Sequence, residues 1–295
     1  MTGTDASLTP LAGGHSGRTF VSEVAGERTV LRIYPPGDPR GPDAPQVDEA
    51  VLHLVRGLVP VPDVLEVRRE DAGAGQPGLL VTTWVPGESG DRLLEELDDA
   101  GLTGLGAAMG SVAATLAGMP MVRPGPYVDA DLRIGSFPEG GLPEWVEHRL
   151  DGWTPEERAM LLPVAEEAQD LLDGVRRACL VHSDLNPKNV LVDPDTLEIT
   201  AVLDWEFAHA GHPWTDVGNL LRFEREPAYV DAVLRAWTER HGGTPSALLD
   251  GARAADLWAL VDLASRAGAN PVADRADVLL RAIADEGDKH AWPGA

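Results

Sequence analysis

Two short apolar runs enclose a dense polar cluster in LVHSDLNPKNVLVD, the segment of residues 180–193. Buried strands normally exclude such side chains, because an unpaired polar atom away from water costs a few kcal/mol. The segment therefore predicts two strand-like pieces that flank a loop whose polar groups bind something. Its oxygen-bearing side chains Asp184 and Asn189 are the first candidates for that task.

A second segment, ITAVLDWEFAHAGHPWTDVGNLL at residues 199–221, places Asp204 directly after an apolar run. If the turn DPDTLE joins the two apolar runs as a hairpin, Asp184, Asn189 and Asp204 lie close together. Carboxylate and amide oxygens suit Mg²⁺, and a carboxylate left over can act on a hydroxyl. The alternative interpretation is that the aspartates only cap turns.

The order H-x-D-x-x-x-x-N, then a strand and D-W-E, resembles the catalytic and metal-binding loops of the protein-kinase-like fold. It resembles the aminoglycoside phosphotransferase family more closely, and AGHPWTDVGNLL is similar to a further motif of that family. The resemblance covers about Leu11 to Phe223. The remaining C-terminal residues match no motif.

The resemblance implies roles for five residues of these segments. Asp184 is expected to be the catalytic base, and Asn189 and Asp204 are expected to hold Mg²⁺ on the phosphates of ATP or GTP. His182 and Asp216 are expected to brace the loop by hydrogen bonds.

One position departs from the protein kinases, which carry lysine two residues after the catalytic aspartate. This chain has Asn186 there, and Lys188 follows two residues later. The departure fits small-molecule kinases, and we expect Lys188 to face water.

The order of patterns predicts an α+β, two-lobed protein-kinase-like fold. Residues 1–85 are expected to form a small β-rich nucleotide-binding lobe with the hinge at its end, and residues 86–295 a mainly helical lobe. Within them we expect a hairpin over 18–34, a helix over 47–58 and strands in VPDVLEVRR and GLLVTTWV. We expect Asp91 to cap a helix over 93–119 that divides at 102–106. We also expect Thr154 to cap a helix over 154–175, with Pro155 at its first position.

The first lobe carries the weaker signals. The glycine-rich turn GGHSG lies where the family's phosphate-covering loop is found, although such turns often only reverse the chain. Arg32 occupies the place of the phosphate-gripping lysine of kinases, with Glu49 as its expected ion-pair partner; the alternative is that both are plain surface charges. The expected nucleotide-binding residues are Gly14, Ser16, Arg32, Glu49, Thr83, Trp84 and Val85.

The acceptor side is predicted from charge. The net charge is -24, which disfavours nucleic acid and favours small cations as partners. The candidate acceptor-binding acids are Glu144, Glu147, Asp151, Asp262, and less specifically Asp256; an ordinary solvated surface is the alternative.

These observations predict a phosphotransferase that moves the γ-phosphate of ATP or GTP to a hydroxyl of a basic antibiotic such as an aminoglycoside. The alternatives are a housekeeping kinase of a sugar, amino alcohol or ketosamine, and a nucleotide-binding module without catalysis. The lone Cys179 and the absence of a signal-peptide pattern predict a cytoplasmic protein without a membrane anchor. The sequence leaves the acceptor, the nucleotide preference and the oligomeric state open.

Overall fold

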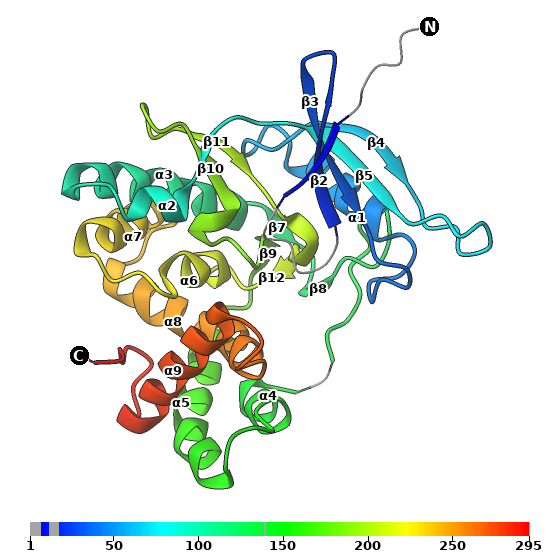
Figure 1. The fold of residues 1–295 in the computed structure, drawn as a ribbon. Helices are drawn as coiled ribbons and strands as arrows, with labels where there is room; N and C mark the ends of the chain where they lie inside the picture. The colour runs from blue at the N-terminus through cyan, green and yellow to red at the C-terminus, as the bar shows by residue number, and fades with distance from the viewer. Residues whose placement is uncertain (1–6, 12–17, 139, 295) are drawn as a thin grey trace, which may run out of the picture. The chain divides into compact units, whose positions relative to one another are not determined.

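The computed structural model describes residues 7–11, 18–138 and 140–294. The chain divides into two compact units. Unit 1 comprises residues 1–97, 125–135 and 187–209, and unit 2 comprises residues 98–124, 136–186 and 210–295. Unit 1 holds an antiparallel sheet and unit 2 is mainly helical, which confirms the predicted α+β class (Figure 1). Because each unit draws on several segments, one boundary after residue 85 does not describe them, and the predicted lobes stay a prediction.

A five-stranded antiparallel sheet forms the body of unit 1, in the order β1-β2-β3-β5-β4. The predicted hairpin over 18–34 is confirmed. Its turn is Ala25-Gly26, and both residues have positive φ, as a tight two-residue hairpin turn requires. The strands are β1 (Ser7–Pro10), β2 (Arg18–Val24), β3 (Glu27–Ile33), β4 (Val64–Arg68) and β5 (Leu79–Thr83).

Helix α1 (Ala44–Val55) packs on β4 and β5 of this sheet. It begins three residues before the predicted helix, because Pro45 is well suited to the first turn. The other elements of unit 1 are short: β6 (Glu88–Ser89), α2 (Gly90–Leu94), β8 (Gly125–Pro126), η1 (Pro187–Asn189), β10 (Val190–Val192), β11 (Ile199–Val202) and η2 (Trp205–Phe207).

Unit 2 has seven described helices together with β7 (Pro120–Met121) and β9 (Ala178–Val181), and its apolar core cluster lies among the fourth, fifth, eighth and ninth helices of the chain. β12 (His209–Gly211) begins where unit 1 ends. Thr154 caps α5 with a capping box and Pro155 in the first turn, as predicted. The helices are α3 (Asp99–Ala117), α4 (Leu142–Arg149), α5 (Pro155–Asp173), α6 (Thr215–Leu221), α7 (Pro227–His241), α8 (Pro245–Ala264) and α9 (Pro271–Glu286).

The predicted helix over 93–119 is wrong in two details. Its interruption lies between Leu94 and Asp99 rather than at 102–106, because the Asp98 side chain accepts the Gly101 N–H and starts α3 there. Ser89, not Asp91, is the N-cap residue of α2.

Helix α3 packs against α7 at two glycines. A Cβ atom on Gly106 or Gly110 would lie 2.6 Å from the carbonyl oxygen of Tyr229 or Val233, respectively. By length and composition alone α3 could cross a membrane, a test that buried core helices also pass, and it is largely buried inside unit 2.

Candidate active site

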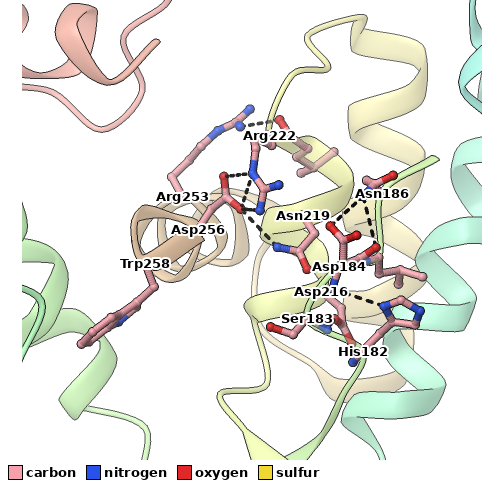
Figure 2. Close-up of polar contacts among 12 residues, drawn as sticks. His182, Ser183, Asp184, Asn186, Asp216, Asn219, Arg222, Arg253, Asp256 and Trp258 are labelled. Atoms are coloured by element: carbon pink, nitrogen blue, oxygen red, sulfur yellow. Dashed lines mark hydrogen bonds and ion pairs between the residues drawn. The ribbon is translucent and has the colours of Figure 1, made fainter. Parts of the chain in front are cut away.

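The loop of residues 182–186 follows β9 in unit 2 and carries Asp184. The backbone N–H of His182 donates to Oδ2 of Asp216 at 3.0 Å, and that of Ser183 donates to Oδ1 at 2.9 Å. The His182 ring is fully buried, and its Nδ1 accepts the Asp184 N–H at 3.2 Å. Asp216, in the first turn of α6, therefore fixes the backbone that presents Asp184 (Figure 2).

A second set of contacts links the same loop to α8. The Asn219 Oδ1 accepts the Leu185 N–H at 3.3 Å, and its Nδ2 donates to Oδ1 of Asp256 at 3.3 Å. Arg222 donates to both Asp256 oxygens from Nε at 3.1 Å, and to Oδ1 from Nη2 at 2.7 Å. Helix α8 comes this close because Gly218 leaves room for its backbone. The loop is thus tied through α6 to a buried ion pair (Figure 2).

Burial and neighbouring charges together set the pKa values of Asp216 and Arg222. Burial raises the pKa of Asp216, although the His182 charge and the two loop N–H groups favour the ionised carboxylate. Burial alone would lower the pKa of Arg222, but the adjacent Asp256 raises it above its ordinary value. The two charges of the Arg222–Asp256 pair therefore depend on each other.

In unit 1 the expected metal ligands lie at the ends of one hairpin. β10 and β11 pair antiparallel with Val190 opposite Val202, and the Leu203 N–H donates to the Asn189 carbonyl at 2.8 Å. Asp204 follows at once, in a left-handed conformation (φ 64°, ψ 57°). Asn189 and Asp204 therefore lie close together, and their hard oxygens fit the donor preference of Mg²⁺. Asp184 belongs to the other unit, and the convergence of all three residues stays a prediction.

Arg32 of β3 forms ion pairs with two carboxylates just after β11. Its Nη1 lies 3.0 Å from Oδ1 of Asp204, and its Nη2 lies 2.5 Å from Oε2 of Glu206. Burial alone would lower the pKa of this guanidinium, but Glu206 and Asp204 are among the groups that raise it above its ordinary value. Among the described residues of unit 1, its ion pairs are with these two carboxylates and not with Glu49, which corrects the predicted pair.

The helix carboxylate that faces the sheet is Asp48, one residue before Glu49. Asp48 is buried, accepts a 2.6 Å hydrogen bond from the Tyr34 hydroxyl and pairs with Arg40 at 2.7 Å. Adjacent helical residues point about 100° apart, so Glu49 is turned away from Asp48.

The three residues of the expected hinge, Thr83, Trp84 and Val85, differ in whether their backbone groups are already hydrogen-bonded. The Thr83 N–H donates to the Asp63 carbonyl at 2.9 Å, and the Trp84 N–H donates to the Arg28 backbone carbonyl at 3.4 Å. The backbone N–H and C=O of Val85 have no hydrogen-bond partner among the described residues of the chain. Val85 is therefore the member of the three best suited to bind a nucleobase through its backbone.

The expected acceptor-binding acids have unequal surroundings. Glu144 accepts the Gly141 N–H at 2.9 Å and so caps α4. Asp262 forms ion pairs with Arg149 and Arg266. Glu147 and Asp151 are exposed.

Asp256 is not exposed to bind the phosphate-accepting molecule, because only 1% of its surface is exposed and its carboxylate accepts hydrogen bonds from Arg222 and Asn219. The expected phosphate-loop residues Gly14 and Ser16 lie outside the described residues. Lys188 is exposed, as expected.

Several residues of these networks were missed from the sequence. Glu206 belongs to the same D-W-E motif as Asp204, yet we gave it no role. Asn219 and Arg222 were missed, although they follow the expected Asp216 at intervals of three residues, which places all three on one side of a helix. Asp256 lies on a distant helix and had no local signal.

Comparisons with known proteins identify the family of this chain. Residues 7–249 match the model of the phosphotransferase enzyme family. The aminoglycoside 3'-phosphotransferase of Streptomyces fradiae is 27% identical over 248 residues, which are 78% of this chain and 85% of that protein.

Longer proteins are also similar. Acyl-CoA dehydrogenase family members 10 and 11 of Mus musculus are 25% and 26% identical over 69% and 78% of this chain. The chain spans only 19% and 29% of their respective lengths.

Solved structures share the fold. A thermostable mutant of aminoglycoside phosphotransferase APH(4)-Ia, in a ternary complex with ADP and hygromycin B, superposes with a TM-score of 0.64 at 22% identity, covering 95% of this chain and 94% of that one. The microcompartment-associated aminopropanol kinase gives a TM-score of 0.67 at 22% identity, covering 96% and 92%. The chain therefore belongs to the phosphotransferase enzyme family, a family of small-molecule kinases, and has their kinase-like fold.

Proposed function

We propose that this chain transfers the γ-phosphate of ATP or GTP to a hydroxyl of a small amine-bearing molecule, with Asp184 as the catalytic base. The observation that carries the proposal is the pair of hydrogen bonds from the 182–186 loop to Asp216, because this buried carboxylate holds the backbone that presents Asp184. Membership of the family supports the reaction class.

In the proposed step the Asp184 carboxylate accepts the proton of the attacking hydroxyl. The hydroxyl oxygen forms a bond to the γ-phosphorus while the bond from that phosphorus to the β,γ-bridging oxygen breaks, and the nucleoside diphosphate leaves. Such transfers have a loose transition state, so orientation and charge neutralisation contribute more than nucleophile activation. Asn189 and Asp204 would hold Mg²⁺, which when bound neutralises charge on the nucleotide phosphates.

Arg32 would bind the nucleotide phosphates with its planar fork of N–H donors. Its ion pairs with Asp204 and Glu206 keep this guanidinium charged and fixed at the end of the β10–β11 hairpin. Val85 would bind the nucleobase through its two backbone groups.

The acceptor we propose first is a basic antibiotic such as an aminoglycoside. The net charge of -24 and the similarity to the Streptomyces fradiae enzyme support it. The second candidate is an amino alcohol, supported by the fold shared with aminopropanol kinase. Both classes carry an amine beside a hydroxyl. We place the reaction in the cytoplasm, where the nucleotide is abundant.

The test is nucleotide consumption with Mg²⁺ and a panel of acceptors: kanamycin, hygromycin B, 1-amino-2-propanol, a ketosamine and neutral sugars. We expect phosphorylation of at least one hydroxylated amine, confirmed by a mass increase of one phosphate. Turnover of neutral sugars alone would overturn the acceptor class.

Variants separate the reaction from the alternative of a binding module. Asp184→Asn is expected to lower kcat at least a hundredfold, the size typical of losing a general base. The control is Asp195→Ala, an exposed position in the turn between β10 and β11. Nucleotide binding without turnover of any panel member would favour the module, and an Asp184→Asn variant with full activity would remove the base assignment.

A further inference from the structure

The Asn186 side chain is hydrogen-bonded to Asp184, the proposed base. Its Nδ2 donates to Oδ1 of Asp184 at 2.8 Å and to the Asp184 carbonyl at 3.2 Å (Figure 2). Its backbone N–H also donates to that carbonyl, at 2.8 Å. The side chain thus folds back onto Asp184 and restricts the rotation of its carboxylate.

This contact also fixes the orientation of the Asn186 amide. The reversed amide would place its carbonyl oxygen against the Asp184 carboxylate, where two acceptors repel each other. In the observed orientation Oδ1 is buried, and it has no hydrogen-bond partner among the described residues. A buried acceptor without a donor costs about 1–3 kcal/mol, so native structures rarely keep one without a use.

The chemistry of a free amide oxygen limits what it can bind. It cannot bind phosphate oxygens, because both are acceptors. Its partner must be an N–H or O–H donor, and a molecule whose hydroxyl meets Asp184 brings such donors beside Asn186. The lysine of protein kinases at this position has donors only, whereas the amide of Asn186 adds an acceptor oxygen.

We propose that Asn186 positions the Asp184 carboxylate through Nδ2 and binds an O–H or N–H group of the acceptor molecule through Oδ1. This inference rests on the proposed function and assigns one contact that selects hydroxyl- and amine-bearing acceptors. The other buried side-chain atoms without a hydrogen-bond partner in the described chain belong to Gln46, His212 and Trp237, which are far from Asn186 in sequence.

Two variants separate the two halves of the amide. Asn186→Ala removes both, so we expect kcat to fall about tenfold and the KM for the acceptor to rise about tenfold, with the KM for ATP unchanged. Asn186→Asp keeps an oxygen at the Oδ1 position but loses the donor to Asp184. It is expected to lose kcat at least as strongly while the acceptor KM changes less than threefold.

The assay uses the best acceptor of the panel, and ATP hydrolysis by water as a probe independent of that acceptor. Hydrolysis is expected to fall in both variants, since each loosens Asp184. Thermal unfolding of Asn186→Ala is expected to stay close to wild type, because the loss of the two Nδ2 hydrogen bonds is offset by the removal of one unsatisfied buried oxygen. A residue with only a structural role would lower the unfolding temperature and leave the acceptor KM unchanged.

The outcomes distinguish the two proposals. Wild-type values of kcat and acceptor KM in Asn186→Ala, with Asp184→Asn inactive, overturn the role of Asn186 alone. A rise in the KM for ATP rather than for the acceptor also overturns it, because Asn186 would then serve the nucleotide. Full activity of Asp184→Asn overturns the proposed function itself.

Discussion

The two units fix their functional side chains by different means. In unit 2 the loop that carries Asp184 is bound by backbone hydrogen bonds to Asp216 and Asn219, behind which lies a buried ion pair. In unit 1 Arg32 meets Asp204 and Glu206 through side-chain charges alone, and 17% of the Arg32 side chain and 30% of the Asp204 side chain are exposed. The first arrangement rests on buried backbone contacts, whereas the second rests on partly exposed ion pairs.

The largest effect is expected from breaking the support in unit 2. Asp256→Ala leaves Arg222 buried without its counter-charge, which should lower the free energy of unfolding by about 3–5 kcal/mol. Urea denaturation measures the loss.

The paired variant Arg222→Met with Asp256→Leu removes both charges and is the control. It should recover most of the stability, since buried ion pairs replaced by apolar groups are often neutral. If Asp256→Ala costs less than 1 kcal/mol, the buried pair does not support the loop as described.

Low pH should also destabilise unit 2, through the partly buried His212. Burial lowers the pKa of His212 to about 4, below the value near 6.5 of an unfolded chain. A lowered folded pKa gives stability that is full above pH 6.5 and is lost as the pH falls toward 4. Between pH 7 and pH 5 the wild type should therefore lose about 2 kcal/mol through this group.

His212→Gln should reduce that loss when urea denaturation is compared at the two pH values. Burial also lowers the pKa of His209, which should account for part of the remaining acid dependence. An unchanged pH dependence in the variant would show that His212 is protonated as easily in the folded as in the unfolded chain.

A smaller structural effect is expected in unit 1. Arg32→Met removes the pairs with Asp204 and Glu206 but leaves Arg40, whose Nη2 lies 3.8 Å from Glu206. The free energy of unfolding should fall by about 1 kcal/mol, as for partly exposed ion pairs. The KM for ATP should rise at least tenfold because the phosphate fork is lost.

Arg56→Met is the matched control, since Arg56 pairs with Asp63 on the surface. It should change neither the stability nor the KM for ATP. A loss of stability in Arg32→Met as large as that in Asp256→Ala would remove the distinction between the two units.

The sequence predicted what depends on local patterns. Periodicity, turn residues and motif order gave the hairpin over 18–34, the capped helix after Thr154 and the proximity of Asn189 and Asp204. Each of these is decided within a few residues, so short-range chemistry is enough.

Predictions failed where competing local signals or distant packing decide the outcome. Asp98 and Ser89 displaced the expected cap and helix break, although both were visible in the sequence. Glu49 and Asp48 are both acidic, and only the packing of α1 on the sheet determines that Asp48 is the buried one, paired with Arg40. The contact of Asp256 with Arg222 depends on how α8 meets α6, which no local pattern encodes.

The smallest expected effect tests backbone strain in both units. Ser183 and Ala25 have φ of 68° and 54°, a left-handed conformation that costs a side-chain-bearing residue about 1–2 kcal/mol and costs glycine little. Because glycine also loses more entropy on folding, Ser183→Gly and Ala25→Gly should each raise the free energy of unfolding by only about 0.5–1 kcal/mol.

Activity distinguishes the two substitutions. Ala25→Gly changes an exposed hairpin turn and should leave kcat unchanged. Ser183→Gly keeps both N–H bonds to Asp216 but gives the residue next to Asp184 more freedom, so kcat should fall less than threefold if Asp216 holds the loop. A tenfold fall would mean that the Ser183 side chain itself, and not the hydrogen bonds to Asp216, keeps Asp184 in position.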